Sequence, residues 1–177
     1  VGPALLVLMG TAVVAGVLLS KSKAQNAGWI VIAAGWGLAL AIAVYAVGAI
    51  SGAHLNPAIT IGQLVVGGIE VGDAGLYIVG QFIGAFVGAV LVWLHYLPHW
   101  AETEDPGLKL ASFSTGPAIR NTPANLVAEA IGTFVLSFGV SAVLLPSNDV
   151  GPLAGLLIGG LLLAIGLSLG GPTGYAV

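Results

Sequence analysis

Long apolar runs alternate with short polar breaks along almost the whole chain. Five of them have the length of a helix that crosses a bilayer: Val1–Leu19, Trp29–Ile50, Ala74–Leu97, Pro123–Leu145 and Gly151–Leu169. About 20 apolar residues in a helix match the roughly 30 Å hydrocarbon core of a membrane. The pattern therefore predicts an all-α membrane protein with five spanning helices.

The polar breaks predict the loops between these helices. Ser20–Asn26 separates the first two runs, and Pro146–Asp149 separates the last two. The longest break, His99–Thr122, contains five of the eleven charged residues of the chain and predicts an irregular loop.

One further apolar segment is too short to span. It follows Asn56-Pro57 and continues to about Gly67-Gly68; about 12 helical residues rise only about 18 Å. Asn is a favoured N-cap, and Pro suits the first helical position because its missing N–H costs nothing there. We predict a re-entrant half-helix that begins inside the membrane and directs its free amides and positive dipole end toward a polar site.

The composition agrees with a membrane protein and excludes several other classes. Charged residues make up 6% of the chain and hydrophobic residues 58%, whereas a soluble domain carries about 25% charged residues. The 28 glycines suit closely packed membrane helices. The absence of Cys excludes a disulfide framework, and the net charge of −3 does not indicate a nucleic-acid partner. Val1–Ala4 has the composition of a helix interior rather than of a signal peptide.

An internal repeat is visible at a shift of 122 residues. Ser51-Gly52-x-x-Leu55 then falls on Thr173-Gly174-x-x-Val177, and Gly10-Thr11 falls on Gly132-Thr133. Both copies begin with two spans and a broken segment, and the second copy starts on the opposite membrane face. Such inverted repeats are typical of transport proteins with sites at mid-membrane. We predict one transmembrane domain over residues 1–177, with a first repeat at about 1–98 and an incomplete second repeat at about 122–177.

Four motifs resemble the aquaporin superfamily, the major intrinsic proteins, in its glycerol-facilitator branch. They are Gly52-Ala53-His54-Leu55-Asn56-Pro57-Ala58-x-Thr60, Gln81-Phe82-x-Gly84-Ala85, Glu129-x-x-Gly132-Thr133 and Gly170-x-x-Thr173-Gly174-Tyr175. The resemblance implies a six-span inverted repeat with two half-helices meeting at the bilayer centre, one pore per chain, and a homotetramer in the cell membrane.

Residues 1–177 hold only part of that pattern. The second half-helix, its Arg and the sixth span do not occur in them, and we expect these parts in a continuation of the chain. The Glu that the family usually has in its first span is also missing. Either it precedes Val1 or Val7 takes its place.

The resemblance implies that Asn56, Pro57 and Ala58 form the pore motif. By geometry, the Asn56 side-chain oxygen can cap the half-helix while its NH₂ group donates into the lumen. The adjacent positive dipole end repels cations and a migrating proton. The simpler alternative is that Asn56 only caps a buried helix.

The resemblance also implies a constriction formed by Trp36, Gly166 and Tyr175, and an approach lined by the backbone of Gly52, Ala53, His54 and Leu55. Each residue also has a structural interpretation: Trp36 as a packing or interfacial residue, Gly166 as a helix-packing glycine, and His54 as a structural histidine. We expect the Tyr175 hydroxyl to stand at the pore wall and to favour more polar solutes.

Gln81 and Glu129 are polar residues inside predicted spans, which makes them functional candidates. We expect both to lie behind the pore and to hydrogen-bond the non-helical loop backbones, which otherwise lack partners. Pore-lining or proton-relay roles are the alternatives.

These features predict a passive channel for glycerol and similar small neutral solutes, and for water, that excludes protons and ions. No catalytic constellation, phosphate loop or metal-ligand cluster is present, so we expect neither an enzyme nor a cofactor. A water-selective aquaporin is the first alternative. An inverted-repeat secondary transporter would need coupling charges in its spans, where Glu129 is the only carboxylate. A purely structural junction protein is disfavoured by the intact Asn56-Pro57-Ala58.

Overall fold

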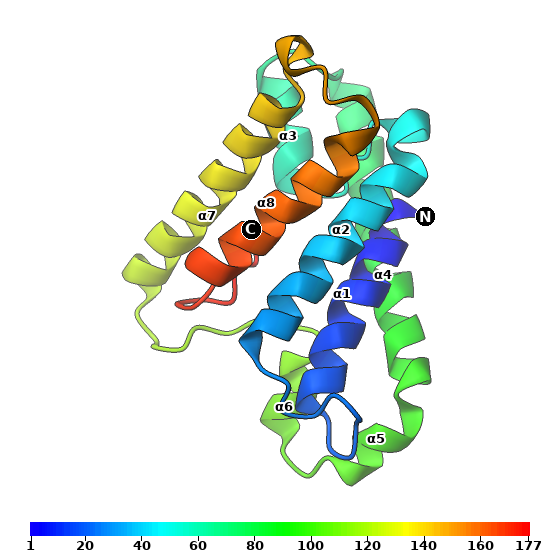
Figure 1. The fold of residues 1–177 in the computed structure, drawn as a ribbon, viewed down its shortest axis with the longest axis vertical. Helices are drawn as coiled ribbons and strands as arrows, with labels where there is room; N and C mark the ends of the chain where they lie inside the picture. Colours follow the sequence, from blue (N-terminus) through cyan, green and yellow to red (C-terminus); the bar gives the residue numbers. More distant parts are fainter.

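The computed structural model describes residues 1–177 as a bundle of helices without strands (Figure 1). Its helices are α1 (Gly2–Leu18), α2 (Trp29–Ser51), α3 (Pro57–Val65), α4 (Val71–His95), α5 (Leu97–Glu102), α6 (Pro106–Ala111), α7 (Thr122–Val143) and α8 (Ala154–Ser168). Two 3₁₀ turns, Pro146–Asn148 and Gly151–Leu153, precede α8.

The long helices pack in the order α4, α1, α2, α8 and α7 across the bundle. Glycines bring α2 and α8 into close contact, because a Cβ at Gly37 would lie 2.7 Å from the Gly159 carbonyl oxygen, and one at Gly159 would collide with the Gly37 carbonyl oxygen. Such small-residue crossings are a common packing device of membrane helices.

Four of the five predicted spans are long and apolar enough to cross a membrane: Trp29–Ser51, Val71–His95, Thr122–Val143 and Gly151–Ser168. The remaining one, α1, has 17 residues, which rise about 26 Å. It lies between α2 and α4 along the same direction (Figure 1).

The outer surface of the bundle is strongly apolar. Leu76 and Ile83 on α4, and Leu126 on α7, are each more than 60% exposed. An apolar surface of this extent is unfavourable in water and fits the hydrocarbon of a membrane.

The polar segment 99–122 differs from the predicted irregular loop, because it contains α6 and most of α5. Pro98 and Pro106 lie in the first turns of these helices, where proline is favoured. Asp105 caps α6, since its Oδ1 accepts a hydrogen bond of 2.7 Å from the Gly107 amide.

The segment after Asn56 is a half-helix, as predicted. Its nine residues rise about 14 Å, roughly half of the hydrocarbon core. It ends at Val65, before the predicted Gly67-Gly68, because Gly67 takes a left-handed conformation with φ +76° and the Gly68 amide bonds back to the Gln63 carbonyl at 2.7 Å.

The loop that leads into α3 and the loop that follows α8 have a similar backbone conformation. Positive φ angles occur at Gly52 (+68°) and Ala53 (+48°) in the first loop, and at Gly174 (+85°) and Tyr175 (+43°) in the second. Left-handed conformations of non-glycine residues store strain and cluster at functional sites.

The side-chain packing behind the first loop also resembles that behind the second loop. The Leu55 side chain lies against Gly2 of α1, and the Val177 side chain lies against Gly132 of α7. Gly2 is therefore the structural counterpart of Gly132. The predicted counterpart, Gly10, instead packs against the ring of Trp36, so that part of the sequence alignment between the repeats was wrong.

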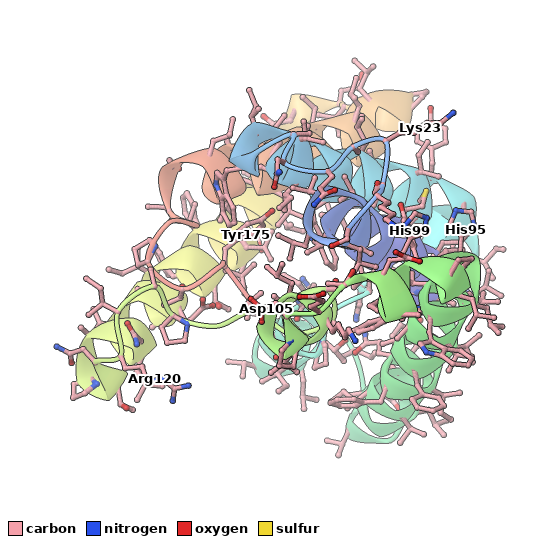
Figure 2. The ribbon with its side chains drawn as sticks, turned by 90° about the horizontal axis from the view of Figure 1, so that it is seen from below. Lys23, His95, His99, Asp105, Arg120 and Tyr175 are labelled. Atoms are coloured by element: carbon pink, nitrogen blue, oxygen red, sulfur yellow. The ribbon has the colours of Figure 1, made fainter.

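All four basic residues lie at the end of the bundle that carries α5 and α6, seen from below in Figure 2. Lys21 forms an ion pair with Glu102, and this hydrogen-bonded contact with Lys21 lowers the pKa of the Glu102 carboxyl. The Ser20 amide donates to Thr103 Oγ1 at 2.9 Å, and Ser20 O lies 2.9 Å from His99 Nδ1. These contacts fasten the loop between α1 and α2 to α5.

Candidate functional site

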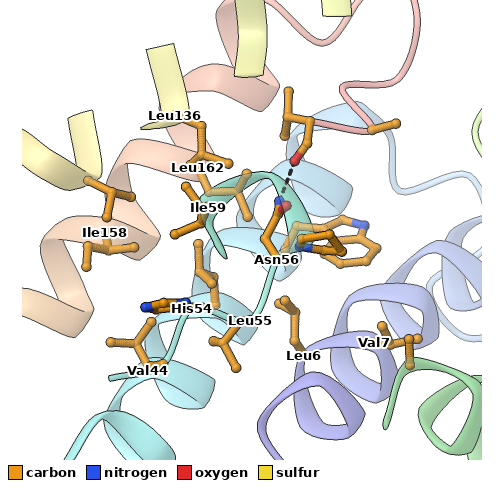
Figure 3. Close-up of a pocket in the computed structure, with 18 of the residues that line it drawn as sticks. Leu6, Val7, Val44, His54, Leu55, Asn56, Ile59, Leu136, Ile158 and Leu162 are labelled. Atoms are coloured by element: carbon orange, nitrogen blue, oxygen red, sulfur yellow. Dashed lines mark hydrogen bonds between the residues drawn. The ribbon is translucent and has the colours of Figure 1, made fainter. Parts of the chain in front are cut away.

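The two loops with left-handed residues meet at Asn56, midway along the bundle. The Asn56 side chain caps α3, because its Oδ1 accepts from the Ala58 amide at 2.7 Å. Its Nδ2 donates to the Val177 carbonyl oxygen at 2.6 Å (Figure 3). Pro57 occupies the first helical position, where no N–H is needed. One amide side chain thus joins the start of the half-helix to the second loop.

A cavity of about 1130 Å³ surrounds this meeting point. Phe113, Ser114 and Thr115 line it at one end of the bundle, and Gly48 and Leu144 line it near the other. The cavity therefore runs along the bundle past Asn56, and Figure 3 shows the lining residues around Asn56.

Eight of the predicted site residues line this cavity: Trp36, Gly52, Ala53, His54, Leu55, Asn56, Pro57 and Tyr175. The other four, which are Ala58, Gly166, Gln81 and Glu129, do not line it. The structure thus brings an aromatic residue from α2 and residues of both loops to one space.

The cavity wall is mostly apolar, and no Asp, Glu, Lys or Arg lines it. Its polar side chains are Thr11, His54, Asn56, Gln63, Ser114 and Thr115. Apolar walls with a few placed polar groups are typical of sites for small uncharged molecules. The arrangement gives a charged solute no compensating partner, so that its desolvation would be costly.

The loop before α7 also contributes to the site. Thr115 packs against Gly174, and the Ala118 amide donates to the Pro172 carbonyl at 3.0 Å. The loop thereby holds Ser114 and Thr115 at the cavity wall. No periodic pattern marks these residues, so only their small polar character signals them.

Gly166 lies behind Tyr175 instead of at the cavity surface. A Cβ at Gly166 would be 2.9 Å from Cζ of Tyr175, so the glycine makes room for the tyrosine ring. Trp29 fixes the same region: its Nε1 donates to the Gly166 carbonyl at 2.8 Å, and its ring meets that of Tyr175 edge to face at 5.6 Å. The sequence reasoning did not identify Trp29.

The Tyr175 hydroxyl does not stand at the wall of the cavity, contrary to expectation. Tyr175 is 8% exposed, and its hydroxyl is buried without a hydrogen-bond partner. The ring faces the cavity while the hydroxyl points toward Gly166 and the helices behind it.

Tyr175→Phe is therefore expected to stabilise the protein. An unsatisfied buried polar group costs about 1–3 kcal/mol, and phenylalanine removes it while keeping the ring. Thermal unfolding in detergent should show a raised melting temperature, and the exposed Tyr45 provides a Tyr45→Phe control that leaves it unchanged. A lowered melting temperature in Tyr175→Phe would show that the hydroxyl has a stabilising partner.

Glu129 supports the second loop from α7. Its Oε1 accepts from the Ala176 amide at 3.2 Å, and its Oε2 accepts from the Val177 amide at 3.0 Å. Both carboxylate oxygens therefore accept hydrogen bonds from the backbone of the second loop, next to the Val177 carbonyl that accepts from Asn56.

Gln81 is held differently from the expected arrangement. Its Nε2 donates to Oγ1 of Thr60 at 2.9 Å, so it contacts a side chain of the half-helix and not the loop backbone. Gln81 is 6% exposed, and its Oε1 has no partner.

Comparisons with known proteins place this arrangement in a family. The family model described as "Major intrinsic protein" matches residues 1–177. The chain is 56% identical to the "Probable glycerol uptake facilitator protein" of Thermotoga maritima over 177 residues, which are 99% of this chain and 75% of that protein. It is 52% identical to the "Glycerol uptake facilitator protein" of Bacillus subtilis, of which it covers 64%.

A solved structure has the same fold. The X-ray structure of the aquaglyceroporin from Plasmodium falciparum superposes with a TM-score of 0.88 at 25% sequence identity, over 99% of this chain and 72% of that one. The half-helix, the inverted arrangement and the family match agree. The chain belongs to the major intrinsic protein family and is an integral membrane protein with an aquaporin-like fold.

Proposed function

We propose that this protein is a passive channel of the cell membrane for glycerol and similar small neutral solutes, and for water, and that it excludes ions and protons. The observation that carries this proposal is the uncharged cavity that runs past the start of the half-helix at Asn56. The names of the Thermotoga maritima and Bacillus subtilis relatives support glycerol as the solute. In this proposal residues 1–177 form one pore domain, with repeats at about 1–98 and 122–177.

The half-helix selects against cations. Its amides and positive dipole end face the cavity at Asn56, in a region of low dielectric where such partial charges act strongly. Asn56 carries two N–H donors, of which Val177 takes one. The second is available to a hydroxyl or a water oxygen, and a water that accepts there is turned so that it cannot relay a proton.

The walls select for a molecule with an apolar and a polar side. The rings of Trp36 and Tyr175 meet the carbon atoms of a polyol, and Gly166 provides the space behind Tyr175 that keeps this ring in place. The hydroxyls meet Asn56 and the backbone of Gly52 to Leu55. A glycerol-sized polyol satisfies both sides at once, whereas a purely apolar molecule leaves the polar groups unpaired.

The alternatives fit the site less well. A secondary transporter needs a titratable or ion-binding group along its passage. The candidate, Glu129, does not line the cavity, and both of its carboxylate oxygens bind the backbone of the second loop. A water-selective channel of the same fold remains the closest competitor, and the solute measurement below separates the two. The family match favours a channel over an enzymatic role.

The proposal includes a homotetramer embedded in lipid. The large apolar side chains that α4 and α7 expose need a cover, which lipid chains and neighbouring subunits would provide. No nucleic-acid partner or cofactor is part of the proposal.

The proposal is tested by stopped-flow light scattering of proteoliposomes. With sucrose outside, vesicles shrink at a rate that reports water permeability; with glycerol outside, they shrink and then reswell as glycerol enters. We expect reswelling that is much faster than in protein-free vesicles and that is unaffected by a proton gradient. Fast shrinkage without accelerated reswelling would establish the water-selective alternative, and acceleration of neither phase would overturn the channel proposal.

Glu129→Leu is expected to reduce glycerol flux strongly. Leucine leaves the amides of Ala176 and Val177 without acceptors, and each hydrogen bond to a charged group contributes about 1.5–3 kcal/mol. Glu129→Gln keeps one acceptor oxygen and should retain an intermediate flux, while Glu104→Gln in an exposed loop should match the wild type. Equal flux in the leucine variant and the wild type would show that the second loop does not depend on this carboxylate.

A further inference from the structure

A chain of hydrogen bonds runs from α4 through the half-helix to the cavity. Gln81 Nε2 lies 2.9 Å from Oγ1 of Thr60, and the same oxygen lies 3.2 Å from Nδ1 of His54 and 3.2 Å from the Asn56 carbonyl oxygen. Thr60 is fully buried, and Gln81 is 6% exposed. His54, at the end of this chain, lines the cavity.

The number of hydrogens in this cluster decides the state of His54. The Thr60 hydroxyl has one hydrogen, the Gln81 NH₂ group can only donate, and the Asn56 carbonyl can only accept. If the hydroxyl hydrogen points to the Asn56 carbonyl, the remaining contact with Nδ1 is a hydrogen bond only when Nδ1 carries the hydrogen. Pointing the hydroxyl at Nδ1 instead would give up its bond to the Asn56 carbonyl, which would then accept only from the Thr60 amide at 3.1 Å.

The same result follows if the Gln81 amide is turned over. Its Oε1 would then accept the Thr60 hydroxyl hydrogen, and Nδ1 of His54 would again be the only donor left for the contact with Oγ1. In either orientation these contacts favour a hydrogen on Nδ1 of the imidazole.

We propose that Thr60, held in place by Gln81, is a positioning residue that fixes His54 in its Nδ1–H tautomer and leaves Nε2 as a bare acceptor toward the passage. The side chain of His54 is hydrogen-bonded through Nδ1, and its Nε2 makes no hydrogen bond to the protein. Tyr77 confines the ring from another side, since the two rings lie 5.0 Å apart and the Tyr77 hydroxyl donates to the Ser51 carbonyl at 2.8 Å.

This inference rests on the proposed function and deepens it. His54 accepts a hydrogen bond from a solute hydroxyl, whereas Asn56, two residues further along the chain, donates one. A solute with two neighbouring hydroxyls can use both groups at the same time. An Nε2–H tautomer would present two donors instead and would lose this complementarity.

The burial of Gln81 agrees with a positioning role. Its Oε1 is buried without a partner, and such a group costs about 1–3 kcal/mol, which an apolar side chain would avoid. Buried polar groups that are incompletely satisfied are found where a specific orientation is needed.

The experiment is nitrogen NMR of protein labelled with ¹⁵N-histidine, because the two ring nitrogens have distinct shifts in each tautomer. His95→Gln and His99→Gln variants assign the signals of the three histidines. We expect His54 to be in the Nδ1–H form in the wild type and in Thr60→Ser, which keeps the hydroxyl. Thr60→Val should show a mixture with Nε2–H, because the hydroxyl that accepts from Nδ1 is lost. Gln81→Leu should show a smaller admixture, because the hydroxyl loses the contact with Gln81 but keeps its bond to the Asn56 carbonyl.

Glycerol flux in proteoliposomes gives the second readout. Thr60→Val should reduce flux several-fold, while Thr60→Ser should stay close to the wild type. An Nε2–H wild type, or an unchanged tautomer in Thr60→Val, would overturn the inference whatever the flux. The expected tautomers without glycerol flux in the wild type would support the positioning of His54 and overturn the proposed function instead.

Discussion

Asn56→Leu is expected to lower glycerol flux by at least about tenfold, which corresponds to roughly 1.4 kcal/mol at the barrier. Leucine removes the cap of α3 and the donor to the Val177 carbonyl, and the loss of an Asn cap alone costs about 0.5–2 kcal/mol. It also removes the second N–H from the passage. The flux should be measured in proteoliposomes by stopped-flow light scattering, with the amount of inserted protein matched.

Asn56→Asp separates the two roles of this side chain. A carboxylate keeps the oxygen that accepts from the Ala58 amide, but it cannot donate to Val177 or to a solute. We expect the aspartate variant to retain a folded half-helix, to lose most glycerol flux, and to admit cations better than the wild type. Wild-type flux in the leucine variant would show that the start of the half-helix does not face the transported solute.

Gly159→Val is expected to destabilise the whole bundle. A side chain at this position would collide with the Gly37 carbonyl oxygen and with Ala41 of α2, and backbone atoms cannot rotate away as a side chain can. Overpacking of a well-packed core costs about 1–3 kcal/mol or more, and here the collision lies in the most extensive helix pair. The measurement is the melting temperature and the folded yield in detergent.

The neighbouring residue provides the matched control. A Cβ at Gly160 would meet no atom within 4 Å, so Gly160→Val tests the same change of residue type, one position away, without the collision. We expect it to melt close to the wild type. A similar loss of stability in both variants would mean that valine itself, and not the contact with α2, is responsible.

The length of each apolar run made the membrane helices predictable. Runs of this kind have few alternatives in a chain with 6% charged residues, and the short segment after Asn56-Pro57 could only be a half-helix. The short helices α5 and α6 were missed because six residues carry no periodic signal. The predicted start of the last span at Gly151 agrees with the span Gly151–Ser168, whose first three residues form a 3₁₀ turn before α8.

The residues of the two loops at the site were predictable because their motifs are local. Contacts between distant parts of the chain were not. The bond from Trp29 to Gly166 joins residues 137 positions apart, and nothing in either neighbourhood indicates it. The Tyr175 hydroxyl and the partner of Gln81 were misplaced for the same reason, because their surroundings depend on how α2, α3, α4 and α8 pack.

The central claim is that a half-helix begins in the middle of an uncharged passage, which admits glycerol and excludes protons. The most direct test of this claim is a simultaneous measurement of glycerol and proton flux. Proteoliposomes with an internal pH-sensitive dye would be mixed with a solution that carries both a glycerol gradient and a pH gradient. We expect glycerol to equilibrate much faster than in protein-free vesicles while the pH gradient decays at the protein-free rate. A pH gradient that collapses together with glycerol entry, or glycerol entry at the protein-free rate, would contradict the claim of a proton-excluding glycerol channel.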